Sequence, residues 1–259
     1  MKRADVRTFD QIRPVSVSYG ICGNADGSVL FELGNTKVLC SVMLQDGVPP
    51  FLRGKGTGWL TAEYTMLPAA TEVRTPREAS TMRRNGRSVE ISRLISRSLR
   101  AIVDSSKFGE RTIYVDCDVL QADGGTRTAA ITGSYCALRQ AVEVWKLEGK
   151  ISKECLIDTL GALAVGLSGD QILLDIDYSE DSTIDADFNF VMTGLGKIVE
   201  VQGATETIPL DWSKIEMMKV LAYKGIKKLL SDVDVLELPV EKSTHLSITL
   251  GDLQKQRQQ

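Results

Sequence analysis

The feature that most constrains the fold is a strand pattern that stops at two glycines and continues as a helix. Residues 111–120 alternate apolar and polar side chains, which is typical of a strand with one buried face. Gly124 and Gly125 break this pattern, and a helix is predicted from Thr126 to about Lys146. This order brings backbone amides and the positive end of a helix dipole to one point, as an anion site requires.

The glycine turn is therefore a candidate site for an oxyanion, most simply a phosphate. A bare Gly-Gly-Thr sequence is better explained as a tight strand-to-helix turn with a capping threonine. Here Thr126 is followed by Arg127, whose guanidinium can bind phosphate through two parallel hydrogen bonds. This arginine, together with those upstream in the chain, favours a phosphate site over the plain turn.

A second feature is a local excess of arginine in a chain whose formal net charge is −3. Residues 74–100 contain eight arginines, no lysine and two acids, so eight minus two gives a local charge of +6. Residues 68–86 show no hydrophobic periodicity and are predicted to form a long loop that is functional or contacts another subunit. The arginines are Arg74, Arg77, Arg83, Arg84, Arg87, Arg93, Arg97 and Arg100.

The opposite imbalance lies in residues 175–187, which contain six acids and no base. Asp185 and Asp187 are two apart on a predicted strand and so share a face, and Asp181 lies in the turn before it. Converging carboxylates raise one another's pKa or bind a hard cation such as Mg²⁺. The alternative is a polar strand with exposed aspartates, and the two charged segments then form solvated faces or pair across a subunit interface.

An amphipathic helix is predicted from Ser88, its N-cap, to Ser105. Arg93, Arg97 and Arg100 lie on one side of this helix and form a basic ridge. The apolar residues on the opposite side are Ile91, Leu94, Ile95, Leu99 and Ile102.

Elsewhere strands and helices follow one another without a repeat or a linker, so one α+β domain over residues 1–240 with a C-terminal tail at 241–259 is the simplest account. Gly34 and Asn35 predict a hairpin turn. The apolar stretch 156–169 fits either a buried helix or a strand. The other predicted elements are strands at 28–34, 36–44, 58–67 and 197–203, two strands within 171–193 that flank a turn near 179–182, and a helix over 212–230.

The composition excludes several kinds of chemistry. Five cysteines are scattered and never in CxxC spacing, which argues against a disulfide framework or a zinc site and favours a reducing cytoplasm. Cys117 and Cys136 fall within strand and helix patterns and are expected in the core. The only histidine is His245, and the sequence has neither a GxxxxGKS/T phosphate loop nor a GxSxG nucleophile elbow. Neither a membrane span nor a signal peptide is expected.

Six longer blocks carry a resemblance to a known family, in order from about Arg3 to Gly225: GNTKVLCSV, PPFLRGKGTGWLTAEYTMLP, NGRSVEISRLISRSLRA, FGERTIYVDCDVLQADGGTRTAAITG, DYSEDST and KIVEVQG. Together they resemble the ribonuclease PH family of phosphorolytic 3′→5′ exoribonucleases. The resemblance implies a single domain of the ribosomal-protein-S5-domain-2-like fold, with mixed sheets and packed helices, in a homohexamer that is a trimer of dimers. It also implies a cytoplasmic enzyme that uses inorganic phosphate and Mg²⁺ to remove 3′-terminal nucleotides from tRNA precursors as nucleoside diphosphates.

The resemblance also assigns roles to individual residues. The phosphate-binding positions are Arg87 in NGRS and Gly125, Thr126 and Arg127 in GGTRT. The catalytic and metal-associated positions are Asp181 in EDS and Asp187 in DFN, and which of these carboxyl groups is a general acid stays open. RNA contact is expected from Arg74 and Arg77 in the loop and from Arg93 and Arg97 on the helix.

Some positions depart from the family pattern without touching those matched to phosphate or metal. Ala69 stands where an arginine is common, which bears on the strength of the hexamer or its grip on RNA. Ser96 replaces a usual glycine, and Phe188 replaces a methionine. Two other functions stay open: a hydrolytic metal nuclease, and a non-catalytic RNA-binding ring subunit. The presence of both Arg127 and Asp187 argues against the second.

Overall fold

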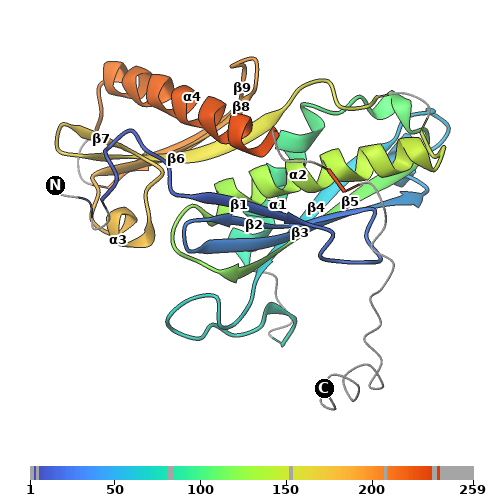
Figure 1. The fold of residues 1–259 in the computed structure, drawn as a ribbon, viewed down its shortest axis with the longest axis horizontal. Helices are drawn as coiled ribbons and strands as arrows, with labels where there is room; N and C mark the ends of the chain where they lie inside the picture. Colours follow the sequence, from blue (N-terminus) through green and yellow to red (C-terminus); the bar gives the residue numbers. More distant parts are fainter. Residues whose placement is uncertain are drawn as a thin grey trace, which may run out of the picture.

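The computed structural model describes residues 3, 6–80, 85–151, 154–206, 209–234 and 238–239, and in this part of the chain it contains two β-sheets (Figure 1). One has five strands in the order β1-β2-β3-β5-β4, and the other has four in the order β7-β6-β8-β9. The first sheet is mixed and the second is antiparallel, and together with the helices they form the α+β fold that the sequence predicts. The strands are β1 Val15–Tyr19, β2 Gly27–Leu33, β3 Thr36–Asp46, β4 Trp59–Met66, β5 Arg111–Gln121, β6 Leu160–Ser168, β7 Gln171–Leu174, β8 Ala186–Thr193 and β9 Ile198–Thr205.

Three long helices pack with the sheets in layers: α1 Gly86–Arg100, α2 Thr126–Leu147 and α4 Trp212–Asp234. α2 lies between the two sheets with α1 beside it, and α4 covers the outer side of the four-stranded sheet (Figure 1). One cluster of buried apolar side chains extends through these layers. None of the helices that the structure describes is both long and apolar enough to cross a membrane.

Strand β5 is an internal strand of the first sheet. It pairs antiparallel with β3 and parallel with β4. A parallel pair needs a crossover connection, and α1 provides it because it lies between β4 and β5 in the chain. The alternation predicted for β5 is confirmed, with one face buried against the helices and Tyr114 and Asp116 exposed on the other. The buried residues are Ile113, Val115, Cys117 and Val119.

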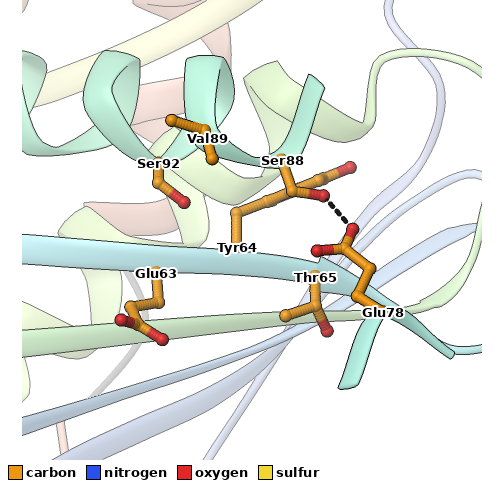
Figure 2. A pocket seen from close by; sticks show the side chains of 7 residues that line it. All are labelled: Glu63, Tyr64, Thr65, Glu78, Ser88, Val89 and Ser92. Atoms are coloured by element: carbon orange, nitrogen blue, oxygen red, sulfur yellow. Dashed lines mark hydrogen bonds between the residues drawn. The ribbon is translucent and has the colours of Figure 1, made fainter. Parts of the chain in front are cut away.

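Helix α1 begins and ends earlier than the sequence predicts. Asn85 is its N-cap, because the Asn85 side chain accepts a 3.0 Å hydrogen bond from the amide of Arg87. The prediction of Ser88 as N-cap is wrong, since the Ser88 hydroxyl instead donates to the Glu78 carboxylate (Figure 2). The helix ends at Arg100, and residues 105–107 form a separate 3₁₀ turn. Its predicted apolar side is confirmed as buried.

Helix α2 follows the glycine turn, as predicted, and is buried on nearly all sides. It is rich in alanine and other small residues, which lets both sheets approach it closely. Cys117 on β5 and Cys136 on α2 are 2% and 0% exposed, so core packing is confirmed for both. All five cysteines have free thiols.

The ambiguous stretch 156–169 contains strand β6. Almost every residue of β6 is buried because α2 covers one face and α4 the other, and this removes any alternation from its sequence. The predicted turn near residues 179–182 is a one-turn helix, α3 Tyr178–Asp181. The last helix extends to Asp234, four residues beyond the prediction. The predicted tail at 241–259, with His245, lies outside the described residues, and the extent of the domain, 1–240, stays a prediction.

Candidate active site

A cavity of about 110 Å³ lies where the first turns of α1 and α2 face α3 and β8. Its wall contains every residue that the sequence assigns to phosphate, catalysis or metal, brought together from four separate segments. These are Arg87, Gly125, Thr126, Arg127, Asp181 and Asp187. Ala164, Ile176 and Asn189 complete the lining.

The glycine turn forms one wall and depends on both of its glycines. Gly124 and Gly125 have φ angles of 74° and 67°, in the left-handed region that favours glycine. A Cβ on Gly124 would lie 2.6 Å from the carbonyl carbon of Asp177, so the turn packs directly against the start of α3. Gly125 caps α2 without a side-chain hydrogen bond, so no cap side chain competes with an anion for the positive end of the helix.

Thr126 is held by a partner that the sequence analysis missed. The Tyr64 hydroxyl donates a 2.9 Å hydrogen bond to Thr126 Oγ1. Burial raises the pKa of Tyr64, which keeps this phenol neutral and able to donate. Tyr64 lies on β4 beneath the start of α1, next to a small cavity of about 40 Å³ (Figure 2). Sequence pattern marks it only as a buried strand residue.

The two arginines enter the cavity from different helices. Arg87 is exposed at the first turn of α1, and Arg127 is half-buried at the first turn of α2. Arg127 Nη1 donates to Gln202 Oε1 at 3.0 Å and lies 3.6 Å from Glu90 Oε1. Arg127 is therefore partly neutralised and oriented before any ligand binds.

A chain of hydrogen bonds leads from Gln202 along β9 to α1. Gln202 Nε2 donates to Glu200 Oε1 at 3.0 Å, and Arg97 Nη2 donates to the same oxygen at 2.7 Å. Arg97 Nε also donates to Glu200 Oε2 at 3.1 Å, and these bonds raise the pKa of Arg97. Arg97, a predicted RNA-binding residue, is thus linked to Arg127, a predicted phosphate-binding residue. The link runs through the side chains of Glu200 and Gln202.

The predicted basic ridge on α1 is only partly realised. Arg93 and Arg97 are exposed and line an open groove of about 250 Å³ beside the cavity. The prediction is wrong for Arg100, which is half-buried 4.4 Å above the ring of Trp59 and donates to the Leu60 carbonyl at 3.2 Å. Trp59 and Leu60 belong to β4, so Arg100 serves packing there.

The carboxylates form the opposite wall. Asp181 ends α3 and is exposed, whereas Asp187 lies on β8 and is half-buried. Burial raises the pKa of each, and the charge of Asp187 raises that of Asp181 further, while Arg87 and Arg127 act in the opposite direction. Glu206 adds repulsion to both, so this wall favours a bound cation or proton.

A second, more open cavity of about 460 Å³ adjoins the carboxylate wall and is lined by Asp181, Asp187, Asp185 and Glu206. Asp185 immediately precedes β8, and its Oδ2 accepts a 2.7 Å hydrogen bond from the Gly169 amide. In the described residues no group of three or more His, Cys, Asp or Glu side chains has the arrangement of a metal site. Asp181 and Asp187 fit Mg²⁺, which is commonly held by one or two carboxylates while substrate phosphate and water complete its coordination.

Asn189 is a further residue of the cavity that the sequence analysis missed. It lies two positions after Asp187 on β8 and is 8% exposed. The same two-residue spacing that grouped Asp185 with Asp187 would have placed Asn189 on this face. Its amide offers both a donor and an acceptor to a ligand.

Arg74 and Arg77, in the loop predicted at residues 68–86, lie outside the cavity. Arg74 and Arg77 are exposed, and Arg83 and Arg84 fall outside the described residues. The bond between Glu78 and Ser88 fastens the end of this loop to α1 (Figure 2). RNA contact by Arg74 and Arg77 stays a prediction.

Comparisons with known proteins show the family to which the chain belongs. The model of the 3′ exoribonuclease family, domain 1, matches residues 11–142, and that of domain 2 matches residues 158–224. Ribonuclease PH of Bacillus pumilus is 49% identical over 229 residues, which cover 88% of this chain and 95% of that protein. Ribonuclease PH of Tropheryma whipplei (strain Twist) is 54% identical over 228 residues, covering 88% and 92%.

Solved structures share the fold at lower identity. Rice (Oryza sativa) Rrp46 superimposes with a TM-score of 0.70 at 19% identity, covering 90% of this chain and 99% of that chain. A chain of the Archaeoglobus fulgidus exosome with RNA bound to the active site gives a TM-score of 0.73 at 21% identity, covering 89% and 92%. At these identities the likeness is one of fold.

Proposed function

The chain belongs to the 3′ exoribonuclease family, and from this premise we propose that its cavity holds the inorganic phosphate with which it shortens RNA. The enzyme is a phosphorolytic 3′→5′ exoribonuclease that trims tRNA precursors. Phosphate attacks the terminal phosphodiester, the bond to the preceding 3′-oxygen breaks, and the last nucleotide leaves as a nucleoside diphosphate. The observation that carries the site is a cavity with two arginines and a helix N-terminus facing two carboxylates.

Charge neutralisation explains the arginines. Two unit negative charges 4 Å apart repel by about 4 kcal/mol at an effective dielectric constant near 20, and phosphate must come closer than this to a phosphodiester. Arg87 and Arg127 offset this repulsion, and the amides at the start of α2 orient the attacking oxygen. Thr126, fixed by Tyr64, offers its hydroxyl to the same anion.

The carboxylates serve the leaving group. Asp181 and Asp187 would hold Mg²⁺, which when bound would supply charge stabilisation on the bridging and leaving oxygens. A carboxyl group with a raised pKa can also donate a proton to the departing 3′-oxygen. Asn189 is close enough to the same wall to orient the terminal nucleotide.

RNA approaches the cavity along α1. The groove lined by Arg93 and Arg97 adjoins the cavity, and both guanidiniums are exposed. Arg74 and Arg77 are exposed and add positive charge for RNA contact, within the same chain or in a neighbouring subunit. Contacts to backbone phosphates suit an enzyme that must move along RNA without reading its sequence.

We also propose that the enzyme acts in the cytoplasm as a homohexamer, a trimer of dimers. The free thiols support a reducing compartment. Solved chains that share this fold come from exosome assemblies, which supports an assembly of several chains here.

The test of the proposed function is product identity. Full-length enzyme is incubated with Mg²⁺ and RNA that carries a 3′ tail, with and without orthophosphate. Nucleoside diphosphates that require phosphate support phosphorolysis. Nucleoside monophosphates formed without phosphate indicate the hydrolytic alternative, and RNA binding without either product indicates a non-catalytic subunit.

A further inference from the structure

A buried ion pair outside the cavity joins its two walls. Asp175 lies between β7 and α3, is 1% exposed, and has a φ of 52°, which aspartate tolerates better than most residues. Its Oδ2 accepts hydrogen bonds from the amide and Nε of Arg13 at 2.7 and 3.0 Å, and its Oδ1 accepts from Arg13 Nη2 at 2.7 Å. Two of these bonds come from the guanidinium and fix its direction, and the third fixes the Arg13 backbone.

Arg13 reaches from this pair to the phosphate-binding turn. Its Nη1 donates to the carbonyl of Asp123, and its Nη2 lies 3.4 Å from the carbonyl of Gly124. A Cβ on Gly125 would lie 3.1 Å from Nη2, so the guanidinium sits directly beneath the turn. Burial opposes the charge of Arg13, but the neighbouring Asp175 outweighs it and the pKa of Arg13 is raised.

On the Asp175 side of the pair, the chain continues through α3 to the carboxylate wall of the cavity. Two residues after Asp175, Asp177 caps α3 and forms a capping box with Glu180. Glu180 is itself buried and bonded to Arg3 at 2.7 and 2.9 Å. Figure 1 shows the N-terminal segment beside β7 and α3, where these contacts form. Asp181, the next residue, faces the cavity.

We propose that Arg13 and Asp175 are positioning residues for phosphorolysis, which set the distance between the phosphate-binding turn and Asp181. This inference rests on the proposed function. A guanidinium can bind both carboxylate oxygens and the turn carbonyls together, whereas a single ammonium cannot. Loosening the pair lets the turn move relative to α3, and a displacement of about 1 Å costs on the order of 100-fold in rate.

The experiment compares the variants Arg13→Lys and Asp175→Asn, each made in the full-length enzyme, with the wild-type enzyme. Asparagine keeps the shape and the tolerance of left-handed φ but removes the charge. We expect the KM for orthophosphate to rise about tenfold or more, with the KM for RNA unchanged, and the rise in Tm caused by orthophosphate to shrink.

Asp26→Asn is the matched control. Asp26 is 7% exposed, accepts a 2.8 Å hydrogen bond from the Leu44 amide, and lies 3.4 Å from Lys150 Nζ, at the far end of β2 from the turn. The Asp26→Asn variant should have a lower Tm in the absence of phosphate and an unchanged KM for orthophosphate. If Arg13→Lys and Asp175→Asn behave in the same way as this control, the pair is merely structural and the proposal is wrong.

Thr36→Val keeps the proposal testable if those variants do not fold. The Thr36 hydroxyl donates to the Gly124 carbonyl at 2.7 Å and accepts from the Asp123 amide at 3.0 Å, so valine loosens the turn without touching the pair. Because the pair stays intact, an unchanged KM for phosphate in Thr36→Val supports the pair as the restraint that sets the position of the turn, whereas a rise of about tenfold or more would overturn the proposal. A wild-type enzyme that releases monophosphates without phosphate would instead refute the proposed function.

Discussion

Arg127 donates a 3.0 Å hydrogen bond from Nη1 to the side-chain oxygen of Gln202, and this contact joins the phosphate end of the cavity to strand β9. Gln202 accepts at its oxygen because its amide nitrogen is engaged by Glu200 at 3.0 Å. If the amide were reversed, a donor would face a guanidinium. Glu200 on β9 therefore sets the orientation of the Gln202 amide, and this amide in turn orients Arg127.

The first prediction concerns this amide. Gln202→Leu removes the acceptor, so Arg127 is less well oriented, and we expect the KM for phosphate to rise by about three- to tenfold, which corresponds to about one hydrogen bond. Gln202→Glu should raise it more, because a carboxylate competes with phosphate for Arg127. Steady-state kinetics with varied phosphate measure both. Gln171→Leu, on β7 and outside the cavity, is the control.

The second prediction concerns the phosphate contact itself. Arg127→Ala removes a charge-assisted contact to the nucleophile, and we expect the KM for phosphate to rise about 10- to 100-fold while the affinity for RNA is kept. Phosphate titrations and RNA binding measured on the same preparations test this. A variant with unchanged KM for phosphate would remove Arg127 from the phosphate site.

The third prediction concerns Asp187. Asp187→Asn should lower kcat by about 100-fold or more and leave RNA binding intact, since the carboxylate acts on the leaving group or its metal. Measuring Mg²⁺ binding separately tells the two roles apart: a metal ligand loses Mg²⁺ affinity, whereas a proton donor keeps it. An unchanged rate would show that Asp187 has neither role.

The fourth prediction concerns stability against pH. Burial raises the pKa of Asp187, so in the absence of Mg²⁺ and phosphate its charge destabilises the fold above that raised pKa. The penalty disappears as pH falls through the raised pKa and below the ordinary value of about 3.9, where the group is protonated in both states. Asp187→Asn should therefore raise the Tm at pH 7 and give a smaller gain at pH 4. An equal gain at both values would contradict this.

The fifth prediction concerns RNA. If Arg74 and Arg77 contact backbone phosphates, each change to alanine should make the plot of log binding constant against log salt shallower by about 0.7. Arg53→Ala, in the loop after β3, is a control for the general loss of positive charge. Equal slopes in all variants would place Arg74 and Arg77 away from the RNA.

Sequence patterns predict the strands and helices that bury only one face, because only these show a clear hydrophobic periodicity. β5 has one buried face and α1 one buried side, so both were recognisable. β6 was ambiguous because helices cover both of its faces and remove the alternation. Asn85 and Ser88 are both good caps by residue type, and only the tertiary bond from Ser88 to Glu78 decides between them.

The same contrast holds for the candidate site. Gly125, Thr126 and Arg127 are contiguous, so local chemistry identified an anion site there. Gln202 is 75 residues from Arg127, and Asp175 is 162 residues from Arg13. Neither partner has a local signal, because such pairs are defined only when distant strands and turns pack together.

The most direct test of the account is the fate of isotopically labelled orthophosphate. Full-length enzyme, Mg²⁺ and RNA with a 3′ tail are incubated with labelled phosphate, and the mononucleotide products are separated. The account predicts one labelled phosphate in the β position of every nucleoside diphosphate released. Unlabelled nucleoside monophosphates, formed at the same rate without phosphate, would contradict it.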